Sequence, residues 1–245
     1  MADDEWWIEA EPFPFVCGRK DTALLIIDMQ NDFCSPGGFA ERLGNDISPA
    51  RAIIPQIAEL LRRFRELGLP VIHTREGHLP DLSDCPPGKL FRSRRCGAGI
   101  GDPGPMGRLL IRGERGHDIV PELAPLPGEP VIDKPGKGAF YRTGLEERLR
   151  SAGIRRLIVT GVTTHVCVHT TIREANDRGF DCLLVTDATA AYDPRDHEAA
   201  VRMTVQQGGI FGWAAPTAAI LVALSGADSR IEKRTAADFG SVKGG

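Results

Sequence analysis

Apolar residues along this chain follow two patterns: continuous runs of strand length, and longer stretches with helical spacing. Continuous runs predict strands that are buried on both faces of a sheet. These runs are Thr22 to Met29, Val71 to Thr74, Val131 to Lys134, Arg156 to Gly161 and Asp181 to Asp187. Helical spacing and helix-boundary residues predict helices from Ser48 to Leu67, Gly144 to Ala152, Val166 to Arg178, Asp196 to Gln207 and Thr217 to Leu224.

The alternation of these strands and helices predicts the fold class. Strands that alternate with helices of this length form right-handed βαβ units around a parallel sheet. We therefore expect an α/β fold with a doubly wound, mostly parallel sheet and helices on both faces. A chain of 245 residues, 42% of them hydrophobic, is long enough for one well-buried domain. The expected division is an N-terminal arm (1–21), one domain (22–224) and a polar tail (225–245).

Two segments stand outside this rhythm. The N-terminal arm is aromatic and interrupted by prolines, with Trp6, Trp7 and Phe13 among its residues. We expect such an arm to pack on its own domain or on a neighbouring subunit. The stretch from Arg75 to about Pro130 is rich in Gly, Pro and Arg and has little periodicity. Connections of this length are usually functional, so it is predicted to be an active-site or subunit-contact excursion.

Composition and charge narrow the class of partner. The chain has 30 basic and 33 acidic residues and a net charge of −3, with both signs scattered. This is unlike a nucleic-acid binder and favours a small, neutral or weakly charged partner. The acidic amino terminus and the lack of an apolar run of about 18 residues argue against export or a membrane span, so we expect a cytoplasmic protein. Six cysteines without a CxxC pair are predicted to be thiols rather than disulfides or zinc ligands.

Three residues at or just beyond predicted strand ends are the candidates for chemistry: Asp28, Lys134 and Cys167. The carboxyl ends of parallel strands meet at one edge of an open sheet, where ligands bind. A carboxylate beside an ammonium has its pKa lowered by about 1–3 units and stays ionised as a base, so Asp28 could take the proton of Cys167. The first turn of a helix favours a thiolate at Cys167. The alternatives are a plain Asp28–Lys134 ion pair and a buried packing cysteine.

The segments that contain these residues resemble the signatures of the isochorismatase-like cysteine hydrolases. They are Ile26 to Phe33, the strand end at Lys134, and Gly161 to Val168. The resemblance spans about Thr22 to Leu224, and the signatures occur in the right order. That family includes nicotinamidases, N-carbamoylsarcosine amidases, ureidoacrylate amidohydrolases and biuret hydrolases. The resemblance implies a six-stranded form of the predicted sheet and identifies Asp28, Lys134 and Cys167 as a catalytic triad.

Several further stretches are most similar to the biuret and triuret amidohydrolases: His73 to His78, Gly97 to Gly104, Asp133 to Gly138, Arg173 to Gly179 and Gln206 to Gly212. This similarity implies that Gln207 contacts the ureide, because one amide offers a donor and an acceptor to alternating N–H and C=O groups. Without this similarity, an equally good interpretation is that Gln207 caps its neighbours at a helix terminus. Phe33 and Tyr192 are predicted pocket walls, or ordinary core. The sequence departs from the biuret hydrolase pattern at two positions: His165 stands where those enzymes tend to have Asp, and Tyr192 stands where they can have a smaller residue. The choice between biuret, triuret and a related ureide as substrate therefore stays open.

The expected function is that of an amidohydrolase that cleaves a terminal C–N bond of a small ureide, biuret or triuret, through an acyl-thioester. Asp28 is the base, Cys167 the nucleophile, and Lys134 holds the carboxylate. The family pattern implies an oxyanion hole from the backbone N–H groups of Thr163 and Cys167, beside a cis peptide between Val162 and Thr163. It also favours a homotetramer. No organic cofactor and no catalytic metal are expected.

Other functions remain as alternatives. Within the family these are ureidoacrylate or N-carbamoylsarcosine amidohydrolase and nicotinamidase; from other classes, a non-catalytic interaction module of the same fold or a metal-dependent hydrolase. On a helix, His165 and His169 share a face, but Cys167 points about 200° away, so the three do not suit one metal ion. Glu76-Gly77-His78 only partly matches the metal motif of nicotinamidases, and the next histidine is His117. Aspartyl-phosphate phosphatases need a second acid where Gln30 stands.

Overall fold

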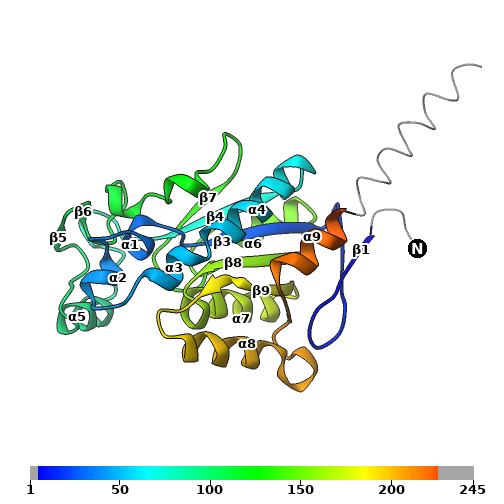
Figure 1. Cartoon of the computed structure of the whole chain (residues 1–245). Helices are drawn as coiled ribbons and strands as arrows, with labels where there is room; N and C mark the ends of the chain where they lie inside the picture. The colour runs from blue at the N-terminus through cyan, green and yellow to red at the C-terminus, as the bar shows by residue number, and fades with distance from the viewer. Residues whose placement is uncertain (1–4, 226–245) are drawn as a thin grey trace, which may run out of the picture.

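The computed structural model describes residues 5–225 and has a six-stranded sheet at its centre (Figure 1). The strands are β3 (Thr22–Ile27), β4 (Val71–Glu76), β7 (Val131–Lys134), β8 (Arg156–Val162), β9 (Asp181–Ala190) and β10 (Trp213–Ala215). Every neighbouring pair is parallel, in the order β10-β9-β8-β3-β4-β7. The predicted doubly wound α/β class is confirmed, and β10 is the strand that the apolar runs did not reveal.

The strand order places a topological switch point between β3 and β8. From β3 the chain moves outward through β4 to β7, and it then returns to β8 on the other side of β3. In open α/β sheets the crevice for ligands lies beyond the carboxyl ends of the strands at such a point. The fold therefore directs attention to the ends of β3, β4, β7 and β8.

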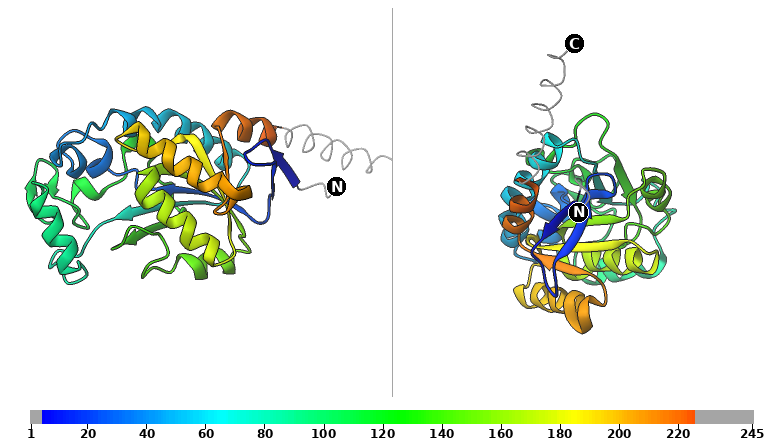
Figure 2. Two further views of the ribbon diagram at one scale, coloured as in Figure 1. Left: turned by 90° about the horizontal axis from the view of Figure 1, so that it is seen from below. Right: turned by 90° about the vertical axis from the view of Figure 1, so that its right-hand side faces the viewer.

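Two apolar layers cover the two faces of the sheet. Alternate residues of β3 serve different layers: Leu24 and Ile26 pack on one face, and Leu25 and Ile27 on the other. The first layer contains α4 (Ile54–Glu66) and α9 (Thr217–Ser225), and the second contains α6 (Leu145–Ser151) and α7 (His169–Asp177). The long helix α8 (Pro194–Gly209) lies beside α7 (Figures 1 and 2). The helix predicted from Ser48 is divided into α3 (Ser48–Ala52) and α4.

The N-terminal arm packs on its own domain. Its strands β1 (Glu5–Ile8) and β2 (Phe15–Gly18) form an antiparallel hairpin whose inward side chains join the first core layer. The connecting loop pairs with the edge of the sheet, because Glu11 and Ala214 exchange backbone hydrogen bonds of 2.9 and 3.0 Å. Trp213 also makes edge contacts with Phe13 and Phe15.

The irregular segments cover the carboxyl end of the sheet (Figure 1). They include α1 (Asn31–Cys34) and α2 (Phe39–Arg42) after β3. The excursion after β4 contains α5 (Pro87–Arg95), the hairpin of β5 (Pro103–Gly104) and β6 (Gly107–Arg108), and the 3-10 turns η1 (Arg115–His117) and η2 (Pro121–Leu123). No helix of residues 5–225 is long and apolar enough to span a membrane. The predicted tail, apart from Ser225 at the end of α9, lies outside the described residues.

Candidate active site

Four buried side chains that could carry chemistry meet at the carboxyl ends of four strands. Asp28 follows β3, Glu76 ends β4, Lys134 ends β7, and Cys167 lies beyond β8 in the π-helical turn η3 (Thr164–Val168). The first three are fully buried and Cys167 is 4% exposed. The structure thus brings together the three residues predicted to act together, and it adds Glu76, which was not among them.

Asp28 and Lys134 form a close ion pair. The Nζ atom of Lys134 lies 2.7 Å from Oδ2 of Asp28, and the hydroxyl of Thr74 donates to Oδ1 at 2.7 Å. Lys134 also donates to the carbonyl oxygens of Gly136 and Lys137, at 3.0 and 2.9 Å. Burial opposes the charge of Lys134, but the neighbouring anionic groups, Asp28 first among them, together outweigh burial and raise the pKa of the ammonium above its ordinary value. Lys134 therefore stays charged.

The backbone at Asp28 is constrained. Its φ of 51° lies in the left-handed region, which is unfavourable for a residue other than glycine. Such strain persists where surrounding contacts determine the conformation, and it is common at functional sites. Here the Asp28 N–H donates to the carbonyl oxygen of Thr74 at 3.2 Å, and the Asp28 carbonyl accepts from the Gln30 N–H at 2.7 Å.

The thiol of Cys167 faces Glu76. Its Sγ donates a hydrogen bond to Oε2 of Glu76 at 3.3 Å. Burial raises the pKa of the Cys167 thiol well above its ordinary value, although Lys134 acts in the opposite direction. Loss of hydration therefore outweighs the groups that favour a thiolate. Cys167 is therefore a neutral thiol at rest, and a base must remove its proton before it can act as a nucleophile.

Glu76 is surrounded by lysines. Its Oε1 lies 2.6 Å from Nζ of Lys89 and 2.8 Å from Nζ of Lys137, and its Oε2 lies 3.8 Å from Nζ of Lys134. Burial alone would raise the pKa of this carboxyl, but the lysine charges hold it well below its ordinary value. Glu76 is therefore a permanent anion and a weak base. The sequence signal for Glu76 was weak, because the apolar start of β4 gives way to polar residues before Glu76 is reached.

Cys167 is positioned by a close approach between β3 and β8. A side chain at Gly161 would collide with Ile27, since its Cβ would lie 2.0 Å from the Ile27 carbonyl oxygen. The peptide between Val162 and Thr163 is cis, as the family pattern implied. The Thr163 carbonyl then accepts from the Val166 N–H at 3.0 Å, which closes the first turn before Cys167. The backbone N–H groups of Thr163 and Cys167, the predicted oxyanion hole, belong to this turn.

A cavity of about 240 Å³ opens onto the thiol. Phe33 and Tyr192 line it, as predicted, and the Tyr192 hydroxyl donates to the Phe33 carbonyl at 3.1 Å. The other wall residues are Phe39, Ala40, Leu43, Asn45, Glu76, Lys137, Val162, Thr163, His165, Val166 and Cys167. The cavity therefore joins an apolar, partly aromatic wall from the α1–α2 segment to a charged floor.

Gln207 is not brought to this cavity within the chain. It is exposed and lies in a non-helical break at the end of α8, with a φ of 53°. Because α8 leads back to the start of β10, Gln207 lies near the amino ends of the strands, away from the thiol. The position of Gln207 therefore does not support a contact with substrate in this cavity. It fits the alternative, a residue at a helix terminus.

The donor set does not suit a metal ion. Among residues 5–225, Asp28, Glu76 and Cys167 form the one group of three acidic, thiol or imidazole side chains whose ligand atoms lie within 4.8 Å of one another. However, lysine ammonium groups already contact both carboxylates. His169 packs instead against the Phe211 ring, and His78 bonds to Asp84 through Nδ1 at 3.1 Å.

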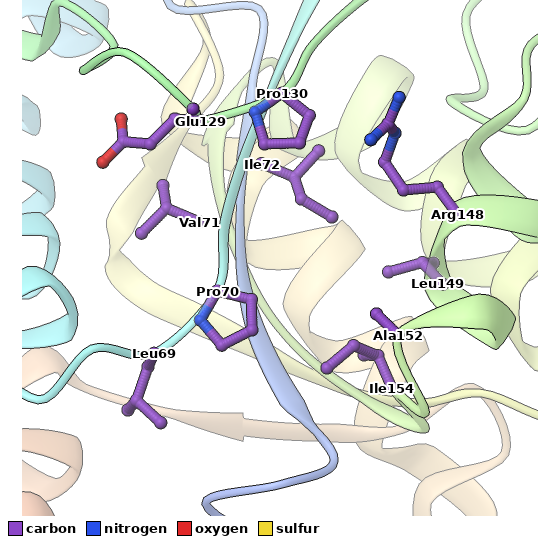
Figure 3. Close-up of a pocket in the computed structure, with 11 residues that line it drawn as sticks. Leu69, Pro70, Val71, Ile72, Glu129, Pro130, Arg148, Leu149, Ala152 and Ile154 are labelled. Carbon is purple, nitrogen blue, oxygen red and sulfur yellow. The ribbon is translucent and has the colours of Figure 1, made fainter.

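A second cavity, of about 300 Å³, lies at the other end of the sheet (Figure 3). Its walls come from the start of β4, the segment before β7 and helix α6, with Val71, Ile72 and Leu149 among them. Glu129 is its acidic residue, and that carboxylate is already bonded to Arg65 at 2.7 Å and to His73 at 3.1 Å. The cavity therefore offers no free reactive group.

Comparison with known proteins identifies the family. The model of the isochorismatase domain matches residues 22–215, so the chain belongs to the isochorismatase family. It is 33% identical over 214 residues to the ureidoacrylate amidohydrolase of Azorhizobium caulinodans, covering 86% of this chain and 93% of the relative. It is also 33% identical over 227 residues to the same enzyme of Methylorubrum extorquens, covering 91% and 90%.

Solved structures agree with this assignment. An isochorismatase family protein from Desulfovibrio vulgaris matches with a TM-score of 0.70 and 32% identity, covering 84% of this chain and 99% of that one. A cysteine hydrolase from Pseudomonas syringae has the same fold, with a TM-score of 0.73 and 24% identity over 86% and 95% of the two chains. The expected biuret or triuret specificity is not supported, since these curated relatives are ureidoacrylate amidohydrolases.

Proposed function

We propose that this protein is a cysteine amidohydrolase that cleaves the ureido group of a small substrate of the ureidoacrylate class. The observation that carries the proposal is the buried group of Asp28, Lys134 and Cys167, in which Lys134 lies 2.7 Å from Asp28 and Cys167 lines the cavity. The curated relatives support the substrate class, because they are ureidoacrylate amidohydrolases. Ureidoacrylate was the alternative to biuret and triuret in the sequence analysis, and it is preferred here.

The charges in the site support an anionic substrate. Three ammonium groups, those of Lys89, Lys134 and Lys137, face two carboxylates, Asp28 and Glu76, while the thiol is neutral. One positive charge is therefore left over next to the cavity. Lys137 lines the cavity and its side chain is 44% exposed. A carboxylate on the substrate would offset this charge, which neutral biuret or nicotinamide would not do.

The chemistry follows from the weak basicity of Glu76. Glu76 is too weak a base to take the thiol proton, so Asp28 takes it as Cys167 attacks the ureido carbonyl carbon. The N–H groups of Thr163 and Cys167 stabilise the oxyanion, and Asp28 returns the proton to the leaving nitrogen. Water, deprotonated by Asp28, then hydrolyses the carbamoyl thioester. Whichever C–N bond breaks first, the net reaction converts the ureide and water into ammonia, carbon dioxide and an amine.

A substrate panel tests this proposal. Ammonia release is measured with ureidoacrylate, N-carbamoylsarcosine, biuret, triuret and nicotinamide, using the wild type and Cys167→Ala. We expect ureidoacrylate to give the highest kcat/KM, by at least about tenfold over neutral biuret. A preference for biuret or triuret would contradict the ureidoacrylate assignment. Ammonia release from none of them would contradict the proposed function.

A further inference from the structure

Lys89 reaches the active site from outside the sheet. It lies on α5, in the excursion that follows β4, and its side chain is 15% exposed. Its ammonium lies 2.6 Å from Oε1 of Glu76 and donates to the carbonyl oxygen of Pro135 at 2.9 Å. It therefore joins the end of β4 to the loop after β7, directly behind the carboxylate that holds the thiol.

The two oxygens of Glu76 have different partners. Lys89 donates to Oε1 alone, at 2.6 Å, and Lys137 donates to Oε1 at 2.8 Å and to Oε2 at 3.2 Å, whereas Oε2 also receives the thiol of Cys167 at 3.3 Å. The backbone of Glu76 is also fixed, because the Gln30 side chain accepts from its N–H at 2.7 Å and donates to its carbonyl at 3.0 Å. The hydrogen bonds of Lys89 and Lys137 thus oppose rotation of the carboxylate, and Lys89 restrains the oxygen that does not contact the nucleophile.

We propose that Lys89 is a positioning residue for the reaction, which acts through Glu76: it fixes Oε1, so that Oε2 remains an ionised acceptor aimed at Sγ of Cys167. This inference rests on the proposed cysteine chemistry and extends it beyond Asp28, Lys134 and Cys167. It also assigns a role to the excursion, since α5 supplies this lysine.

The effect of losing Lys89 on the pKa of Glu76 depends on the other charges around that carboxylate. Lys134 and Lys137 approach the carboxylate from β7 and the loop after it, Cys167 faces it from η3, and Asp28 lies across the same group. His78, two residues along the chain, bonds to Asp84. Removal of one of three lysines weakens but does not abolish the field that lowers the pKa of Glu76. The pKa of Glu76 should therefore rise, and the active form should be lost at a higher pH.

The test compares Lys89→Met and Lys89→Gln with Lys89→Arg, and uses Arg95→Met as a matched control on the exposed face of the same helix. The pH profile of kcat and the KM are measured with the best substrate of the panel. We expect the two uncharged variants to lose about tenfold or more in kcat with KM changed less, and to shift the acid limb upward by about half a unit or more. Lys89→Arg should recover most of the kcat, and Arg95→Met should match the wild type.

A second readout needs no substrate, so it separates failure of this inference from failure of the proposed function. Alkylation of Cys167 by iodoacetamide is followed by peptide mass spectrometry, which distinguishes it from the exposed Cys96. We expect labelling of Cys167 to slow several-fold in Lys89→Met and Lys89→Gln, because loss of a cation disfavours the thiolate. The inference would be overturned if a folded uncharged variant labelled Cys167 at the wild-type rate and kept the acid limb of its kcat pH profile at the wild-type pH. A second outcome would also overturn it: both uncharged variants fail to fold, while Lys89→Arg folds and is labelled at the wild-type rate. Lys89 would then be purely structural.

Discussion

The Sγ atom of Cys167 donates to Oε2 of Glu76 at 3.3 Å, although the lowered pKa of that carboxyl makes it a weak base. The lysines around Glu76 keep it charged, and burial keeps the thiol neutral. The hydrogen bond therefore holds the thiol without removing its proton. Proton transfer is left to Asp28, whose oxygens are fixed by Lys134 and Thr74.

Thr74 orients the proposed base. Its hydroxyl donates to Oδ1 of Asp28 at 2.7 Å and lies 3.2 Å from the Asp28 backbone nitrogen. Thr74→Val keeps the shape but removes the hydroxyl, so we expect a loss of about 1–3 kcal/mol in the free energy of unfolding and about tenfold in kcat. Thr74→Ser keeps the hydroxyl and should retain most of the activity. Equal activity of the Val and Ser variants would mean that this hydrogen bond does not orient Asp28.

The Asp28–Lys134 pair should show strong coupling in stability. Both side chains are fully buried, so Lys134→Met leaves the Asp28 carboxylate without its cation, and Asp28→Asn removes the nearer of the two carboxylates beside the ammonium. Each single change should lower the free energy of unfolding by about 3–5 kcal/mol, measured by urea denaturation. The double variant should regain much of that stability while remaining inactive. If the two losses simply added, the residues would not form an ion pair in the folded protein.

Glu129 should give the fold a stability that depends on pH. Burial opposes its charge, but hydrogen bonds from Arg65 and others lower the pKa of Glu129 to about 2. A carboxyl whose pKa is depressed by folding stabilises the protein above its unfolded value, and that contribution is lost as the pH falls through the folded value. Glu129→Gln should therefore cost on the order of 2–3 kcal/mol at pH 7 and progressively less between about pH 5 and pH 2. A difference that stays constant across this range would contradict the pKa shift.

The core of the fold is predictable because its strands are continuous apolar runs. The run from Val131 to Lys134 matches β7 at both ends, and Asp28 and Lys134 could be placed at one edge of the sheet on that basis. The strand β10 escaped notice because it is only three residues long and follows the irregular end of α8. That irregular end also carries Gln207 away from the site.

The sequence alone did not identify Glu76, Lys89 and Lys137, which complete the site. The second strand was predicted to end at Thr74, so Glu76 was not counted as a strand-end acid like Asp28, although β4 continues to it. Lys89 and Lys137 come from segments without a regular apolar pattern, and only the folded chain brings them to Glu76. The state of the Cys167 thiol likewise depends on its burial, which its position after a strand does not specify.

The most direct test of the covalent mechanism is a rapid-quench experiment read by mass spectrometry. Wild-type protein is mixed with ureidoacrylate, quenched in acid within one turnover and digested, and the peptide that contains Cys167 is examined for an added carbamoyl group, either unsubstituted or still carrying the acrylate on its nitrogen. We predict a transient adduct on Cys167 in the wild type, with no adduct and a loss of at least about a thousandfold in turnover for Cys167→Ala. Undiminished ammonia release by folded Cys167→Ala would contradict the mechanism.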